Sequence, residues 1–92
     1  MVAMVIEHPA VIVNSLGMHA RPAAQVVRLA STFRSGVELE CNGQRVNAKS
    51  IMGVMTLAAE TGATVVVRAE GDDAEAAVLA LVALIAAGFG EV

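Results

Sequence analysis

Aromatic residues are scarce in this 92-residue chain, which has no tryptophan or tyrosine and only two phenylalanines, Phe33 and Phe89. Proteins that hold single-stranded nucleic acids stack the bases on aromatic side chains and line the groove with positive charge. The chain has a net charge of −3, so it meets neither requirement. We therefore expect no nucleic-acid partner.

Cysteine is also scarce. Cys41 is the only one, which excludes an intramolecular disulfide and any Cys-x-x-Cys redox or metal motif. A metal carrier needs closely spaced soft ligands, and the sequence offers only Cys41, His8 and His19, far apart along the chain. We expect no metal and no cofactor, and we expect Cys41 to be a buried or half-buried strand residue.

Long apolar runs are missing too. The longest uncharged stretches are too short to span a bilayer or are broken by glycine and proline, so we expect no membrane insertion. Residues 1–7 hold neither a basic cluster nor an apolar stretch that ends in a cleavage site, which predicts no secretory signal and a cytoplasmic location. A chain of this length builds one modest core, so we expect a single domain over residues 1–92 that acts as a monomer.

Charge is unevenly distributed. Residues 14–56 hold five basic and two acidic residues, a net charge of +3, whereas the rest of the chain holds one basic and seven acidic residues, a net charge of −6. Any anionic ligand or acidic partner should therefore meet the first half of the chain.

β-branched residues and the alternation of apolar with polar residues predict four strands. They lie at residues 5–13, 37–41, 44–47 and 64–70. Pro9 suits an edge strand or a strand start, because proline cannot donate a hydrogen bond within a sheet. Asn42-Gly43, between the second and third strands, predicts a tight hairpin.

Apolar residues at three- and four-residue spacing predict three helices. They run from about Ala20 to Ser35-Gly36, over residues 51–59 with Ser50 as the N-cap, and over residues 74–87 between an acidic first turn and Gly88. The order βαββαβα, with its obligatory hairpin, predicts an α+β fold. The sheet should be antiparallel or mixed, with the helices packed on one face.

A histidine lies where the first loop becomes a helix, in Gly17-Met18-His19-Ala20-Arg21-Pro22-Ala23-Ala24. The unpaired N–H groups and partial positive charge of a helix start stabilise a phosphoryl group by about 0.3–2 kcal/mol. Arg21 can add charge-assisted hydrogen bonds of about 1.5–3 kcal/mol. Pro22 fits the first turn, where no N–H donor is needed.

Neutral imidazole is a nucleophile at physiological pH and forms a labile phosphoramidate. We therefore predict that His19 carries a labile phosphoryl group without help from a metal. A histidine without such a setting is usually an ordinary surface or core residue. We keep that interpretation for His8, which has no basic neighbour.

A second segment, Asn47-Ala48-Lys49-Ser50-Ile51-Met52-Gly53-Val54-Met55, begins the second helix. A phosphate on an N-cap serine is tolerated by the helix dipole and adds about −1.5 to −2 charge there. Ile51, Met52 and Met55 are close together in helical space. Such residues are usually core, but a short helix cannot bury every side, so an exposed docking patch is also credible.

With these two segments, nearly all of the chain resembles the histidine-containing phosphocarrier (HPr) family of the bacterial phosphotransferase system. The resemblance implies an open-faced β-sandwich with a four-stranded antiparallel sheet and three helices on one face. It also implies that His19 accepts a phosphoryl group on Nδ1 from enzyme I, which takes it from phosphoenolpyruvate, and passes it to an IIA protein or domain. The chain would then be a relay and not a turnover enzyme.

The resemblance assigns further roles. Arg21 would orient the phosphate, and Ser50 would be the regulatory site of an HPr kinase/phosphorylase. Ile51, Met52 and Met55, with Ala20 and Ala24, would form an apolar docking surface. The Ser50 segment resembles the sugar-related branch, which predicts sugar uptake and carbon catabolite regulation, whereas the tail Ala-Leu-Ile-Ala-Ala-Gly-Phe-Gly-Glu resembles the nitrogen-related branch, with a purely regulatory role.

A small ferredoxin-like regulatory domain that binds a ligand is compatible with the same order of strands and helices. It would leave His19-Ala20-Arg21-Pro22 unexplained. Phosphorylation of His19 by enzyme I and phosphoenolpyruvate would discriminate between the two interpretations.

Overall fold

The structure is a computed structural model that describes residues 4–91. Met1, Val2 and Ala3, part of the segment that argued against a secretory signal, lie outside the described residues. The elements are β1 (Val5–Val11), α1 (Ala20–Ala30), β2 (Gly36–Cys41), β3 (Gln44–Asn47), α2 (Ile51–Thr56), β4 (Thr64–Glu70), α3 (Ala74–Ala86) and the 3-10 turn η1 (Gly88–Gly90). The predicted order βαββαβα is confirmed.

The four strands form one sheet in the order β1-β4-β2-β3, and every neighbouring pair is antiparallel. Of the two arrangements that the sequence left open, the antiparallel sheet is therefore the correct one. Strand β1 lies at an edge, which is where Pro9 was expected. Asn42 and Gly43 join β2 to β3 with φ angles of 53° and 80°, and positive φ at both turn residues is the mark of the type I′ hairpin.

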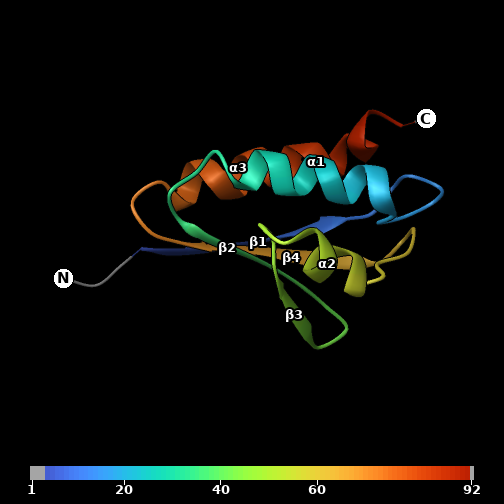
Figure 1. Cartoon of the computed structure of the whole chain (residues 1–92), viewed down its shortest axis with the longest axis horizontal. Coiled ribbons are helices and arrows are strands. Elements are labelled where there is room, and N and C mark those ends of the chain that lie inside the picture. The colour runs from blue at the N-terminus through green and yellow to red at the C-terminus, as the bar shows by residue number, and fades with distance from the viewer. Residues whose placement is uncertain (1–3, 92) are drawn as a thin grey trace.

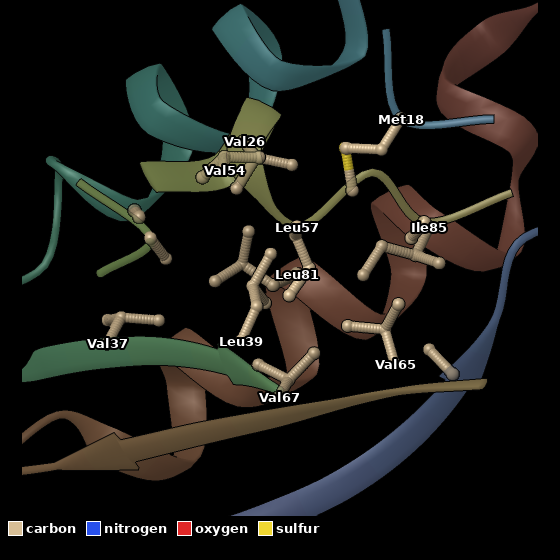
Figure 2. Close-up of a cluster of buried hydrophobic side chains, with 14 of the residues drawn as sticks. Met18, Val26, Val37, Leu39, Val54, Leu57, Val65, Val67, Leu81 and Ile85 are labelled. Atoms are coloured by element: carbon tan, nitrogen blue, oxygen red, sulfur yellow. The ribbon is translucent and has the colours of Figure 1, made fainter. Parts of the chain in front are cut away.

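Helices α1 and α3 lie side by side over one face of the sheet, and α2 packs against α1 (Figure 1). Alternate residues of the strands point toward the helices, so β2 contributes Val37 and Leu39 to the core and β4 contributes Val65 and Val67. Figure 2 shows these side chains meeting those of all three helices, among them Val26, Val54 and Leu81. Burying a side chain of this size contributes about 1.5–3 kcal/mol.

The other face of the sheet has no helix over it (Figure 1). It carries charged side chains. Arg68 lies at the centre of this face, 3.1 Å from Glu38 and 3.4 Å from both Glu7 and Glu70. Because these pairs are partly exposed, each contributes only about 0–1 kcal/mol. The alternation of inward apolar and outward charged residues thus produces the one-sided architecture predicted from the sequence.

Helix α1 is shorter than predicted: it ends at Ala30 and not near Ser35. The backbone N–H groups of Arg34 and Ser35 donate to the carboxylate of Asp73, at 2.9 Å each, and not to carbonyls of the preceding turn. Asp73 lies at the N-cap of α3, but its side chain makes no cap hydrogen bond there. Between Ala30 and Arg34, the N–H groups of Thr32 and Phe33 donate to the carbonyls of Leu29 and Ala30 in a tighter turn. A carboxylate distant in sequence therefore holds the segment that follows α1.

Helix α2 and strand β1 also end earlier than predicted. Helix α3 ends at Ala86, one residue before its predicted end. Helix α2 ends at Thr56 and not at residue 59, because Ala58 has a φ of 50° and Ala59 turns its carbonyl toward another loop. Strand β1 ends at Val11 and not at residue 13, since Ile12 bonds the loop before β4. Cys41 is buried in β2, as predicted. None of the helices in the described part of the chain has the length and apolarity needed to cross a bilayer.

Candidate functional site

The start of α1 offers unpaired N–H donors to an anion. His19 is the N-cap, with an extended backbone and no side-chain cap hydrogen bond, and its carbonyl accepts from the N–H of Ala23 at 3.0 Å. Pro22 has no N–H to satisfy. The N–H groups of Ala20 and Arg21 have no acceptor among residues 4–91, so they remain available to a ligand at the positive end of the helix dipole.

The loop before His19 is held in place by the segment after α2. Met18 is buried, and its N–H donates to the carbonyl of Ala59 at 2.8 Å. Gly17 has a φ of 67°, and a Cβ atom there would lie 2.6 Å from the same carbonyl. Only glycine fits this position, which explains why it precedes Met18 and His19.

The two ring nitrogens of His19 have different surroundings. Nε2 lies 2.8 Å from Oε2 and 3.1 Å from Oε1 of Glu91. Nδ1 makes no hydrogen bond with any residue in the range 4–91, and the side chain is 34% exposed. In the neutral ring, Nε2–H therefore donates to the Glu91 carboxylate and the lone pair on Nδ1 is free for nucleophilic attack.

Glu91 and Asn14 belong to this site, although the sequence did not indicate either. The hydrogen bond from His19 holds the pKa of Glu91 below its usual value against the opposing effect of burial, and the amide of Asn14 and the charge of Arg21 act in the same direction. Glu91 and His19 are 72 residues apart in sequence, so no local pattern could have joined them.

Arg21 is exposed and forms no ion pair or side-chain hydrogen bond within the described residues. Its charge nonetheless reaches the site, since it lowers the pKa of Glu91. The guanidinium is thus free to bind an anion at the start of α1. His8, by contrast, lies exposed on the edge strand, and its Nδ1 is 2.7 Å from the carbonyl of Pro9. It belongs to no such cluster.

Ser50 is the N-cap of α2, as predicted, and its Oγ accepts from the N–H of Gly53 at 3.1 Å. The residue is half-buried. Lys49 beside it donates to the carbonyl of Phe33 at 2.9 Å and connects the start of α2 to the turn after α1.

The apolar patch on α2 is exposed. Ile51, Met52 and Met55 are 44%, 76% and 42% exposed, whereas Val54 faces the core. On α1, Ala20 is exposed and Ala24 is half-buried. Since α1 and α2 pack together, these residues lie on neighbouring helices.

Leu16 adds to the exposed apolar surface near His19. It is 74% exposed in the loop before α1, and sequence reasoning did not single it out. Its only signal is its place in the loop three residues before His19. For a metal, the described residues contain no group of three His, Cys, Asp or Glu side chains close enough to bind one.

The sequence of the chain is similar to those of known proteins over most of its length. The family model described as "PTS HPr component phosphorylation site" matches residues 6–87. The phosphocarrier protein HPr of Cupriavidus necator is 52% identical over 80 residues, which cover 87% of this chain and 90% of that protein. The phosphocarrier protein HPr of Xylella fastidiosa is 45% identical over 86 residues, which cover 94% and 97%.

Solved structures agree with these sequence relatives. The crystal structure of an HPr from Thermoanaerobacter tengcongensis superposes with a TM-score of 0.90 at 49% identity, covering 95% of this chain and 98% of that one. That of a phosphocarrier protein HPr from Bacillus anthracis gives 0.84 at 41% identity, covering 88% and 96%. The similarity thus extends over nearly the whole described fold.

Proposed function

The chain belongs to the HPr family of phosphocarriers in the phosphotransferase system, and from this premise we propose that His19 is the residue that carries the phosphoryl group. The protein is a relay component and not an enzyme that completes turnover. The free Nδ1 of His19 at the start of α1 is the single observation that carries the assignment of the residue. Membership of this family also sets aside the ferredoxin-like ligand-binding domain.

The proposed transfer needs only groups present on this chain and its partners. Nδ1 of His19 attacks the phosphorus of the phosphohistidine on enzyme I, a new N–P bond forms, and the old N–P bond breaks with its electron pair left on the donor. The charge on the transferring group is stabilised by the guanidinium of Arg21 and by the free backbone N–H groups of Ala20 and Arg21. In the second transfer a nucleophile of an IIA protein or domain attacks the phosphorus, and the Nδ1–P bond breaks with its electron pair left on Nδ1.

Ser50 is proposed as a regulatory site modified by an HPr kinase/phosphorylase. A phosphate on its Oγ would lie at the positive end of α2 and would add about −1.5 to −2 charge. Ile51 and Met52 follow it directly in the exposed patch. We expect the added charge to weaken docking there, because an apolar contact loses free energy when a charge beside it must be desolvated.

The docking partners are proposed to be enzyme I and IIA proteins, which would contact Ala20, Ala24, Ile51, Met52 and Met55. We also propose that the protein is a monomer, that it lies in the cytoplasm and that it binds no nucleic acid. Of the two branches of the phosphotransferase system, we propose that the protein serves the sugar-related one, in sugar uptake and carbon catabolite regulation. Measured rates of transfer to a sugar-specific IIA and to a nitrogen-related IIA would decide between the branches, and faster transfer to the second would overturn this preference.

The assignment of His19 is tested by incubation with enzyme I and phosphoenolpyruvate. We expect an acid-labile, alkali-stable phosphoryl adduct that disappears in His19→Ala and persists in the matched control His8→Ala.

For Ser50, we expect an acid-stable adduct formed from ATP and the kinase that is lost in Ser50→Ala. Failure of a competent kinase to modify the wild type, while it modifies another member of the family, would reject that site.

A further inference from the structure

The segment after α3 turns back to bring an acidic side chain to His19. Gly88, Phe89 and Gly90 have φ angles of 65°, 59° and 75°, and such angles are unusual for phenylalanine. The side chain of Phe89 is buried, which holds the turn in this conformation. The N–H of Glu91 donates to the carbonyl of Gly88 at 2.9 Å. The direction of Glu91 is therefore set by a tight, anchored turn and not by a free tail.

Asn14 holds the carboxylate of Glu91 from the other side. It is buried, and its Nδ2 donates to the carbonyl of Gly17 at 2.8 Å and to Oε1 of Glu91 at 3.0 Å. Both partners are acceptors, so the orientation of the amide is fixed. Its Oδ1 is buried and has no hydrogen-bond partner within residues 4–91. Keeping an unpaired polar atom is costly, and such atoms need a reason.

We propose that Glu91, held by Asn14, is a positioning residue that fixes the ring of His19 with its Nδ1 lone pair outward. This proposal rests on the function proposed for His19. Glu91 touches Nε2 and not the reacting nitrogen, so it acts through the ring. A carboxylate in this place selects the tautomer that carries its proton on Nε2.

The same contact supports the phosphorylated state. As the Nδ1–P bond forms, the ring takes on positive charge while Nε2 keeps its proton, and the carboxylate of Glu91 compensates that charge across the hydrogen bond. When the phosphoryl group leaves, the electron pair of the Nδ1–P bond returns to Nδ1. Nε2 keeps its proton throughout, so the relay exchanges no proton with solvent.

The other charged groups around this pair are few. Arg21 of α1 acts on Glu91 in the same direction as His19. Helix α2 carries no charged residue. The acidic residue Glu60 lies in the loop after α2, and its backbone lies beside Gly17.

The contact is tested first without phosphate, by NMR on the full chain. We expect ring nitrogen shifts that show the proton of His19 on Nε2 in the wild type and a mixture of tautomers in Glu91→Ala. We also expect the pKa of Glu91 to rise in His19→Ala. A ring with the same tautomer in Glu91→Ala as in the wild type would overturn the proposal.

The consequence is then tested with enzyme I. We expect Glu91→Ala to lower kcat for phosphorylation of the chain by roughly three- to tenfold with little change in KM, which corresponds to the loss of one hydrogen bond. Glu91→Gln, which keeps an acceptor, should recover part of the rate. Glu75→Gln, an exposed carboxylate of α3, is the control and should match the wild type.

The outcomes separate the two proposals. A wild-type chain that enzyme I phosphorylates, with an unchanged kcat in Glu91→Ala, would contradict the role of Glu91 alone. A wild-type chain that enzyme I does not phosphorylate would contradict the role of His19 instead. The tautomer measurement needs no phosphoryl donor, so it stands in either case.

Discussion

Arg21 is exposed and unpaired in the described structure, which gives it little part in folding. We predict that Arg21→Ala lowers the rate of phosphoryl transfer by roughly 10- to 100-fold, because a hydrogen bond to a charged group contributes about 1.5–3 kcal/mol. Rapid-quench kinetics with enzyme I would measure it. Arg28→Ala, an exposed arginine further along α1, is the control. A large fall in melting temperature for Arg21→Ala would show that the residue is structural.

Gly17 is the residue whose replacement should disturb the loop before His19 most. A Cβ there meets the carbonyl of Ala59 at 2.6 Å and also strains a φ of 67°, so Gly17→Ala should cost about 2–4 kcal/mol of unfolding free energy. Gly43→Ala is a matched control, since its φ is 80° but nothing lies within 4 Å of the added Cβ. Urea unfolding should show a smaller loss for the control, and equal losses would refute the clash.

The connection between α1 and α3 should depend on pH. The Ser35 hydroxyl and the backbone N–H groups of Arg34 and Ser35 lower the pKa of Asp73 to about 2. A carboxyl with a lowered folded pKa stabilises the protein above its unfolded pKa of about 4, and that stability is lost as pH falls toward 2. Thermal unfolding from pH 5 to 2 should therefore show a shallower acid decline in Asp73→Asn than in the wild type.

The neighbouring carboxylate provides the comparison for that prediction. Asp72 is exposed and forms no ion pair or hydrogen bond within residues 4–91, so Asp72→Asn should follow the wild-type acid decline. An equal change in both variants would mean that overall charge, and not the contact with Ser35, sets the pH dependence.

Local patterns predicted the elements well where each element is decided locally. Asn42-Gly43 specified the hairpin, and Ser50 specified the start of α2, because a turn or a cap depends on a few adjacent residues. The ends of α1 and α2 were wrong by several residues. Beyond both ends the chain is held by distant residues, by Asp73 after α1 and by the loop at Met18 after α2, and propensity could not reveal these contacts.

At the scale of the whole molecule, the exposed apolar patch on α2 should govern partner binding. We predict that Met52→Glu raises KM for phosphorylation by enzyme I with little change in stability, because Met52 is 76% exposed and a charge there must be desolvated on docking. Leu79→Glu is the control, since Leu79 is 59% exposed on α3. If both variants bind enzyme I as the wild type does, the patch is not the docking surface.

Only part of the candidate site could be predicted from the sequence. His19, Arg21 and Pro22 are adjacent, so their shared role could be inferred from spacing and from the chemistry of a helix start. Glu91 reaches the ring of His19, and Asn14 reaches Glu91, only when the loop after β1, the start of α1 and the turn after α3 come together in the fold. A group that depends on tertiary packing leaves no periodic signal in one sequence.

The central claim is that Nδ1 of His19 carries the phosphoryl group while Nε2 keeps its proton. Phosphorus and nitrogen NMR of the chain phosphorylated by enzyme I tests it most directly, because coupling between the two nuclei identifies the bonded nitrogen. We predict coupling to Nδ1 of His19 and a protonated Nε2. Phosphorus bonded to Nε2 of His19, or to His8, would contradict the account.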